Sequence, residues 1–305
     1  YPSGYYTVNT YDNDYGFLTE VKDKYGRQLW KVNSENARGQ ITEVQRGGKT
    51  TKFGFDSKGL PTSIKASGII NLNYDFGNDG NLNHRVDSIM GQKEVFAYDG
   101  MNRLTNWDIY QNNVLVKPNN MVYNTNTGTI TSKSDLNNLT MLYGENGKPH
   151  ALTGISGVPT NFPTDSLNVT YTDFKKIKTL TESNKHYILT YGIDDQRRKL
   201  EYKINGVTQK TKYYLGDYEE ETDNLGNIKK IHYLSGSAIL INTNGEDTLY
   251  YGYSDYQGNL IALANEAGTV IERYTYDPWG KRRNPADWTQ DDTRTNWIID
   301  RGYTM

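Results

Sequence analysis

A short formula, Tyr-Asp-x-x-(Asn/Gly)-Arg-Leu, recurs along this chain of 305 residues and constrains its fold more than any other feature. The reference copy lies at residues 98–104, after a strand-like alternation of side chains over residues 95–98. The carboxylate of Asp99 can accept hydrogen bonds from backbone N–H groups just downstream, and Gly100 and Asn102 tolerate a positive φ. The formula therefore predicts a strand, a turn and a return strand that Leu104 opens.

Whole or partial copies of this formula occupy most of the sequence. Turn positions at Gly39, Gly59 and Gly80 lie about 20 residues apart, and further ones follow at Gly128 and Gly147. Two strands of about 6–8 residues with two turns give that period, so each repeat is one hairpin plus its connection to the next. The residues assigned to the structural repeat are Tyr11, Asp12, Phe55, Asp56, Tyr74, Asp75, Tyr98, Asp99, Arg103, Leu104, Tyr276, Asp277 and Gly280.

The repetition predicts an all-β fold of antiparallel hairpins that form one continuous curved or spiralling sheet, part of a shell wall. Residues 1–305 form a single array in this interpretation, with a candidate subdomain break at residues 154–163, where glycines and prolines gather. Since a fragment cannot close a shell, we expect at least one open sheet edge, able to pair with another chain. Residues 285–294 are expected to hold at most one short turn of helix.

Composition excludes several classes of function. The chain has no cysteine, which rules out disulfides, cysteine-ligated metals and thiol nucleophiles. Its net charge is −2, so no basic field favours nucleic acid, and no apolar run approaches the roughly 18 residues of a membrane helix. Tyrosine is abundant, with 26 residues, while the aliphatic core is thin, which favours extended sheets with a wet face. The first residues show no signal peptide, so we expect the sequence to be a piece of a longer chain.

The repeat carboxylates Asp12, Asp56, Asp75, Asp99 and Asp277 are the first candidates for catalysis. Acid–base catalysis needs two groups that converge in one pocket with separated pKa values. Each of these aspartates instead takes the same place in its own turn, so hydrogen bonding within the turn is the favoured interpretation. No catalytic residue and no cofactor is assigned.

No metal site is predicted. Residues 75–81 lack the alternating acidic ligands and the distal glutamate of an EF-hand, and the four histidines are isolated, without a paired zinc motif. The acidic run at residues 219–221 is expected on a solvated edge or loop. The five tryptophans are assigned to cross-strand packing, with a sugar-stacking surface as the alternative.

An ordered set of motifs resembles the YD-repeat, or RHS (rearrangement hotspot), family over nearly the whole chain. The motifs lie at residues 96–105, 130–135, 148–153, 169–174 and 268–285, and the last of these matches best. Residues 301–304 are similar to the opening of the RHS-associated core. Residues 253–260 depart from the family pattern, which usually carries His and Leu-Gly-Ser there.

The resemblance implies antiparallel sheets that spiral into a hollow shell, which in bacterial polymorphic toxins and insecticidal toxin complexes encloses a variable C-terminal effector. In many members the core cleaves itself with aspartates at DPxG-type motifs. Asp277-Pro278-Trp279-Gly280 has these letters but lies in the preceding Tyr-Asp repeat, so a turn role is favoured for Asp277.

The predicted function is therefore a non-enzymatic, encapsulating scaffold of a secreted or surface bacterial protein. The expected partners are the C-terminal core and effector of the same parent chain, with surface glycans as a second class and no nucleic acid. One alternative is a carbohydrate- or cell-surface-binding module. The other is a polysaccharide-degrading enzyme, which needs acidic and basic side chains clustered in one groove; the sequence shows no such cluster.

Overall fold

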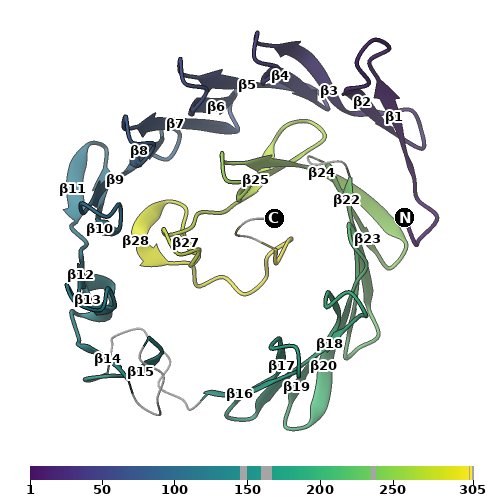
Figure 1. The fold of residues 1–305 in the computed structure, drawn as a ribbon. Helices are drawn as coiled ribbons and strands as arrows, with labels where there is room; N and C mark the ends of the chain where they lie inside the picture. Colours follow the sequence, from purple (N-terminus) through teal and green to yellow (C-terminus); the bar gives the residue numbers. More distant parts are fainter. Residues whose placement is uncertain (145–149, 159–166, 235–237, 302, 304–305) are drawn as a thin grey trace. The chain divides into compact units, whose positions relative to one another are not determined.

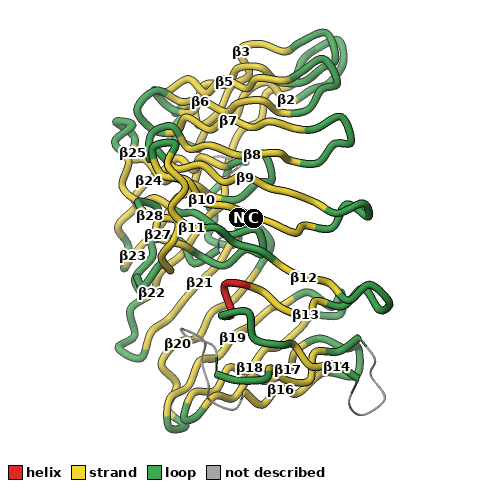
Figure 2. The backbone as a smooth tube through the Cα atoms, turned by 90° about the vertical axis from the view of Figure 1, so that its left-hand side faces the viewer, coloured by secondary structure: helices red, strands yellow, loops and turns green. Residues whose placement is uncertain are grey.

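The computed structural model describes residues 1–144, 150–158, 167–234, 238–301 and 303, and their regular structure is almost entirely β. The strands form two sheets of eleven strands and three sheets of two. Within this part of the chain, the one helical segment is η1 (Ser134–Leu136), a single 3-10 turn (Figure 2). The all-β prediction is confirmed.

The first eleven-stranded sheet follows chain order, so each strand pairs with the next one along the sequence (Figure 1). Its strands are β1 (Thr7–Tyr11), β2 (Leu18–Asp23), β3 (Gln28–Glu35), β4 (Ile41–Arg46), β5 (Lys49–Phe55), β6 (Pro61–Ala66), β7 (Ile70–Phe76), β8 (Leu82–Asp87), β9 (Gln92–Tyr98), β10 (Leu104–Gln111) and β11 (Val114–Lys117). Nearest-neighbour order is what a succession of hairpins produces.

The second eleven-stranded sheet has the same linear order. Its strands are β16 (Leu167–Tyr171), β17 (Ile177–Glu182), β18 (Lys185–Tyr191), β19 (Arg197–Ile204), β20 (Val207–Tyr214), β21 (Tyr218–Asp223), β22 (Ile228–Leu234), β23 (Ala238–Thr243), β24 (Glu246–Ser254), β25 (Leu260–Asn265) and β26 (Val270–Arg273). Neither sheet closes on itself within the described residues, because β1 and β11 end the first and β16 and β26 end the second. The expected open edges are therefore present.

Three short hairpins complete the described secondary structure: β12 (Met121–Tyr123) with β13 (Ile130–Lys133), β14 (Met141–Tyr143) with β15 (Leu152–Ile155), and β27 (Arg283–Asn284) with β28 (Asp287–Asp291). The last pair corrects the expectation of a helical turn within residues 285–294. The side-chain oxygen of Asn284 accepts a hydrogen bond from the N–H of Ala286 (2.9 Å), and this Asx turn starts a hairpin.

Two predicted features fall wholly or partly on residues that the structure does not describe. The predicted turn at residues 145–148 lies outside the described residues. Of the predicted subdomain break at residues 154–163, residues 159–163 also lie outside them. The organisation of residues 1–305 as a single array stays a prediction.

By its internal contacts the chain divides into two units. Unit 1 comprises residues 1–50, 165–252 and 264–269, and unit 2 comprises residues 51–164, 253–263 and 270–305.

Unit 1 buries aliphatic side chains together with an aromatic group. Val21 and Leu29 on β2 and β3 are fully buried, as are Ile231 and Leu240 on β22 and β23. The buried His232 packs its ring against three tyrosine rings, those of Tyr1, Tyr5 and Tyr218, with centroid distances of 5.0–5.4 Å. Tyrosine thus supplements the aliphatic core, as the composition predicts.

Unit 2 has two layers. On β7, Ile70, Leu72 and Tyr74 are buried, and the intervening residues are more exposed, as expected for a strand with one covered face. The covering layer consists of the later segments of the unit, residues 253–263 and 270–301, which we call the return segment. Figure 1 shows its hairpin β27–β28 beside β9 and β10, and Gln92 on β9 donates a hydrogen bond to the carbonyl of Ala286 in that hairpin (2.8 Å).

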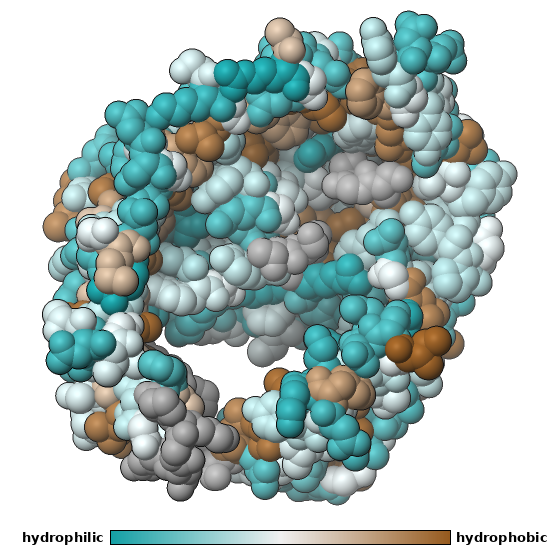
Figure 3. Space-filling view, in the orientation of Figure 1, coloured by the Kyte–Doolittle hydropathy of each residue, from teal (hydrophilic) through white to brown (hydrophobic). Residues whose placement is uncertain are grey.

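Figure 3 shows hydrophilic and near-neutral residues over most of the face in view, with apolar residues in small separate patches. No helix among the described residues is long and apolar enough to cross a membrane.

Candidate functional site

The aspartate of the reference repeat holds its turn directly. Asp99 Oδ1 accepts hydrogen bonds from the backbone N–H groups of Met101 (2.9 Å) and Arg103 (3.0 Å). The backbone closes the same turn, because Asn102 N–H donates to the Asp99 carbonyl at 3.0 Å. Of the two residues expected to tolerate a positive φ, Asn102 adopts one (58°) and Gly100 does not. One left-handed residue at the end of the turn is enough to reverse the chain.

Other aspartates of the repeat make the same pair of hydrogen bonds. Asp56 Oδ1 accepts from the N–H groups two and four residues downstream, both at 2.8 Å, and Asp277 Oδ1 does the same at the same distances. Asp12 accepts from the N–H groups two and three residues downstream, in a turn that is one residue longer. These aspartates are therefore occupied by their own turns.

The sequence analysis missed two further aspartates of this kind. Asp223 and Asp255 accept the same two backbone hydrogen bonds, all at 2.9 Å. Neither follows an aromatic residue, so the formula does not find them. The signal that would have found them is asparagine four residues later, because Asn227 and Asn259 each donate a side-chain hydrogen bond to the second carboxylate oxygen (2.8 Å).

The assignment of Asp75 to a turn is wrong. Asp75 lies within β7, and its Oδ2 accepts a hydrogen bond from the side chain of Asn83 (3.0 Å) across the hairpin. The turn begins at Gly77, whose N–H donates to the carbonyl of Asn81 (2.8 Å). Phe76 and Gly77 therefore take the Tyr-Asp places, two residues after the predicted ones. Strand periodicity cannot detect a shift of two, because residues two apart share a face.

The tyrosine of the repeat ties one hairpin to the preceding one. Tyr98 Oη donates a hydrogen bond to the carbonyl of Leu82, which opens the return strand of the preceding hairpin (3.0 Å). The same contact recurs from Tyr123 to Leu104 at 2.9 Å and from Tyr191 to Ile177 at 2.6 Å. Leu104, assigned to the repeat for its side chain, thus also supplies a backbone acceptor.

The other aromatic residues assigned to the repeat behave differently. Phe55 has no hydroxyl group, and Tyr11 in the first hairpin is 54% exposed, so it does not pack as the repeat predicts. Tyr74 is buried within β7 and packs its ring edge-on against Tyr256 (4.8 Å between centroids). Tyr276 is buried, and its hydroxyl has no hydrogen-bond partner among the described residues.

The remaining repeat residues stabilise the turns. Arg103 Nε donates to Asp99 Oδ2 (2.7 Å), and this hydrogen bond is the main reason that the pKa of Asp99 lies below its usual value. The Arg103 guanidinium also lies 4.3 Å from the ring centroid of Tyr123. Gly280 has a φ of +87°, and a Cβ there would lie 2.7 Å from the Tyr303 ring, so only glycine fits without a shift.

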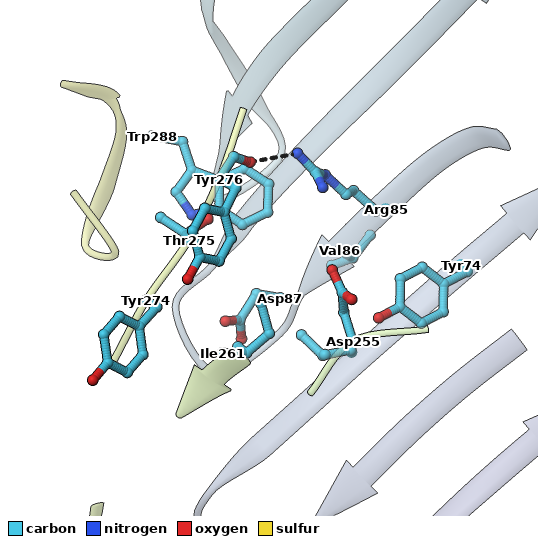
Figure 4. Close-up of a pocket in the computed structure, with 11 residues that line it drawn as sticks. Tyr74, Arg85, Val86, Asp87, Asp255, Ile261, Tyr274, Thr275, Tyr276 and Trp288 are labelled. Carbon is cyan, nitrogen blue, oxygen red and sulfur yellow. Dashed lines mark hydrogen bonds between the residues drawn. The ribbon is translucent and has the colours of Figure 1, made fainter. Parts of the chain in front are cut away.

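A buried ion cluster joins the return segment to the sheet of unit 2. Glu94 on β9 is fully buried; it accepts hydrogen bonds from Arg85 Nε on β8 and from Arg283 Nη1 on β27, both at 2.8 Å. Arg85 and Arg283 also donate to the carbonyl of Tyr276, at 2.7 and 2.8 Å, and Figure 4 shows the first of these bonds. Burial acts to raise the pKa of Glu94, but the positive charges of Arg283 and Arg85 outweigh it and lower this pKa.

A small cavity lies beside this cluster. Its volume is about 30 Å³, and the residues around it include Asp87, Asp255, Tyr74 and Tyr276, which Figure 4 shows converging from the sheet and the return segment. Burial raises the pKa of both aspartates. A space of this size matches one water molecule and no larger substrate. Asp87 Oδ1 also accepts hydrogen bonds from the next turn, from the N–H groups of Ile89 (3.0 Å) and Met90 (3.2 Å).

No group of three or more acidic or histidine residues that could hold a metal ion occurs in the part of the chain that the structure describes.

The acidic run at residues 219–221 is not on a solvated edge or loop, which corrects the prediction. It lies in β21, in the interior of the second sheet. Glu219 is fully buried and pairs with Lys212 at 2.8 Å, and Glu221 pairs with Lys210 at 2.8 Å. Lysines on the neighbouring strand β20 therefore neutralise Glu219 and Glu221, and Glu220 accepts a hydrogen bond from Tyr218 Oη (2.6 Å). Strand register rather than local charge density decides the place of the run.

Comparison with known proteins gives a likeness of fold and a short sequence match. No family model matches the sequence. Over 120 residues the chain is 27% identical to the tRNA3(Ser)-specific nuclease WapA of Bacillus spizizenii and 26% identical to the tRNA nuclease WapA of Bacillus subtilis. These matches cover 37% of this chain and 5% of either relative.

Several solved structures that resemble this one are toxin-complex chains. The crystal structure of TcdB2-TccC3 without the hypervariable C-terminal region superimposes with a TM-score of 0.68, over 93% of this chain and 18% of that chain, at 13% identity. TcdB2-TccC3-Cdc42 gives a TM-score of 0.67 over 91% and 18%, also at 13% identity. The Tc holotoxin pore of Photorhabdus luminescens gives 0.59 with the same coverage and identity. The fold is RHS-like. At this identity the likeness is one of fold, and the chain spans less than a fifth of either kind of relative.

Proposed function

We propose that this chain is a non-enzymatic wall segment of a secreted or surface bacterial RHS/YD-repeat protein, whose shell encloses a C-terminal core and effector. The observation that carries the proposal is the RHS-like fold over 93% of the chain, shared with toxin-complex chains that are several times longer. Enclosure of an effector is a property of a whole shell, and this chain supplies a run of consecutive hairpins for one.

The mechanism in this proposal is mechanical. Turns such as those at Asp99 and Asp56 are closed by their own aspartate, so these hairpins are complete without help from distant residues. Tyrosine hydroxyl groups then link neighbouring hairpins through backbone carbonyls. In unit 2 the buried Glu94 holds the return segment against the sheet through Arg283. Such a wall excludes proteases and keeps a polypeptide apart from its targets.

The non-enzymatic part of the proposal rests on how the acidic residues are used. Asp277, whose motif resembles a self-cleavage site, accepts two backbone hydrogen bonds from its own turn. The nuclease activity named for WapA is not transferred, because the matched region is 5% of those proteins. The other alternative, a polysaccharide-degrading enzyme, needs acidic and basic side chains clustered in one groove with a carboxylate free to act. Asp87 and Asp255 flank a space of only about 30 Å³. In a larger cleft of unit 2, Asp135 and Asp291 are each paired with a lysine at 2.7 Å.

The test of enclosure uses the complete product of the gene that encodes this chain. The native product and a Glu94→Gln variant are treated with a non-specific protease, and fragments are followed by mass spectrometry. We expect the polypeptide that follows the repeats to resist cleavage in the native protein and to be cut faster in the variant. Equal cleavage of that polypeptide in the native protein and in isolation would refute enclosure.

The test of the enzymatic alternative is separate. The purified 305-residue chain is incubated with tRNA and with neutral polysaccharides, and its own mass is measured over time. We expect intact substrates and an intact chain. Cleavage at Asp277 that Asp277→Asn abolishes would contradict the turn interpretation, and substrate turnover would contradict the scaffold proposal.

A further inference from the structure

Two tyrosines of unit 1 face each other across neighbouring strands in a geometry that the scaffold function does not require. Tyr187 on β18 and Tyr202 on β19 are directly opposite in the antiparallel register. Their rings are stacked, with centroids 4.7 Å apart and an interplanar angle of 17°. Both strands lie in the interior of the second sheet, so the pairing of the strands fixes the distance between the rings.

The hydroxyl groups of the two rings lie close together. The pKa of Tyr187 is raised, first by burial and then by the charge and the hydrogen bonding of the Tyr202 hydroxyl group. When two nearly parallel rings have adjacent hydroxyl groups, the ortho carbons beside those groups also face each other. These are the carbons at which a tyrosyl radical carries much of its unpaired electron.

The surroundings of the pair leave it open to oxidation. Both side chains are half-buried, so a small oxidant can approach them while the sheet holds the rings in place. The same row across the sheet continues with Leu180 on β17, opposite Tyr187, and with Lys210 on β20, opposite Tyr202. Aliphatic and ammonium groups do not give up an electron as readily as a phenol, so neither neighbour competes for the oxidant.

From this geometry we propose that Tyr187 and Tyr202 form a modification site, at which a one-electron oxidant joins the two rings through a carbon–carbon bond. Each phenol gives one electron to the oxidant and its hydroxyl proton to solvent, and the two tyrosyl radicals couple at their ortho carbons. The hydrogen on each coupled carbon then moves as a proton to the phenol oxygen, which restores both aromatic rings. The pair loses two electrons and two protons in total. A haem peroxidase with hydrogen peroxide, or a photoexcited metal complex with an electron acceptor, is an oxidant of this class.

The product is a covalent link between β18 and β19. It closes a loop of about 15 residues, for which a cross-link lowers the equilibrium constant of unfolding by about a hundredfold. The site goes beyond the scaffold function. Rings in this geometry can couple in a chain that encloses nothing, and a wall can enclose an effector without the link, so either proposal can fail while the other stands.

The chain offers a matched control pair in unit 2. The rings of Tyr74 and Tyr256 have centroids 4.8 Å apart, nearly the same separation, but they meet edge-on at 71°. Tyr74 is buried and Tyr256 is half-buried. An edge-on contact aims the edge of one ring at the face of the other, so it does not set two ortho carbons against each other.

The test is oxidation of the dilute 305-residue chain by photolysed tris(bipyridine)ruthenium(II) with persulfate, followed by recovery of the monomer by gel filtration. We expect the monomer to lose the mass of two hydrogen atoms and to gain dityrosine fluorescence. Mass spectrometry after trypsin digestion should show two peptides joined at Tyr187 and Tyr202. Tyr187→Phe and Tyr202→Phe keep both rings but remove one phenol, and each should lower the yield of the link by about tenfold or more. Tyr256→Phe should leave that yield within about twofold.

Three outcomes would overturn the proposal. One is a monomer that keeps its full mass although exposed tyrosines have already coupled between molecules in the same sample. The second is a yield of dityrosine in the monomer that Tyr187→Phe and Tyr202→Phe leave unchanged, while circular dichroism shows both variants folded. The third is a link between Tyr74 and Tyr256 that forms as fast as the one in unit 1, which would show that ring orientation does not select the site.

Discussion

Replacement of Glu94 by glutamine tests the ion cluster that holds the return segment in unit 2. The side chain of Glu94 is 0% exposed, and those of Arg283 and Arg85 are 6% and 13% exposed. Glutamine has nearly the same volume but carries no charge, so two buried guanidinium groups lose their counter-ion. Removal of one partner from a buried ion pair costs about 3–5 kcal/mol. At about 2–4 °C per kcal/mol for a unit of this size, Tm should fall by about 6–20 °C.

Thermal unfolding followed by tryptophan fluorescence measures this loss, since Trp107, Trp279 and Trp288 all belong to unit 2. The matched control is Asp291→Asn, which breaks the exposed pair with Lys281 in the same unit. An exposed pair contributes about 0–1 kcal/mol, so Tm should fall by no more than about 4 °C.

The stability of the Glu94→Gln variant relative to the native chain should depend on pH in a direction that the shifted pKa of Glu94 predicts. The pKa of Glu94 is lowered in the folded state, so its contribution is present above the unfolded value of about 4.3. That contribution is lost as the pH falls through the folded pKa of Glu94. The difference in Tm between the native chain and the variant should therefore become smaller in this pH range. A variant that loses no more stability than Asp291→Asn at pH 7 would refute the argument that this cluster anchors the return segment.

Three further predictions follow from contacts elsewhere. Tyr98→Phe should lower the free energy of unfolding by about 0.5–1.5 kcal/mol, because it removes the hydrogen bond to the Leu82 carbonyl. Tyr276→Phe should be neutral or stabilising, because that buried hydroxyl has no partner among the described residues. Urea denaturation measures both variants, and equal losses of stability would contradict this explanation. Lys212→Ala should lower the free energy of unfolding by about 3–5 kcal/mol, because it leaves the buried Glu219 without its ion-pair partner. Lys210→Ala on the same strand should lower it by about 1 kcal/mol or less. A lower urea midpoint for Lys210→Ala than for Lys212→Ala would contradict the register of β20 and β21. The pKa of Asp87 is raised in the folded state, so its contribution to stability is fully present below about pH 3.9 and is lost as the pH rises through the folded pKa. The Tm of Asp87→Asn should therefore rise relative to that of the native chain between pH 4 and 7. A difference in Tm between the two proteins that does not change with pH would exclude this effect.

Local chemistry explains the parts of the fold that the sequence predicted. A turn such as the one at Asp99 is complete within about five residues, because one carboxylate satisfies two N–H groups and one left-handed residue reverses the chain. Repetition of such turns leads to antiparallel strands in chain order and to open edges, whatever packs against them. The hairpins, the all-β class and the roles of Asp12, Asp56 and Asp277 in their turns could therefore be predicted without coordinates.

Register and distant pairing set the limit of that prediction. A shift of two residues keeps every side chain on its face, so Tyr74-Asp75 and Phe76-Gly77 fit the alternation equally well, and only the hydrogen bonds distinguish them. Likewise, the burial of Glu219 depends on Lys212, a residue on the neighbouring strand that local charge density does not reveal.

The sequence by itself determined the repeating unit, because the atoms that close each turn lie within a few residues of one another. Only the tertiary structure decided what the return segment does. Arg283 forms its ion pair with Glu94, which lies nearly two hundred residues earlier in the sequence. The Trp279 ring likewise packs against the ring of Trp107 and the ammonium group of Lys133. Such contacts depend on the three-dimensional path of the chain after residue 253, and no local pattern encodes that path.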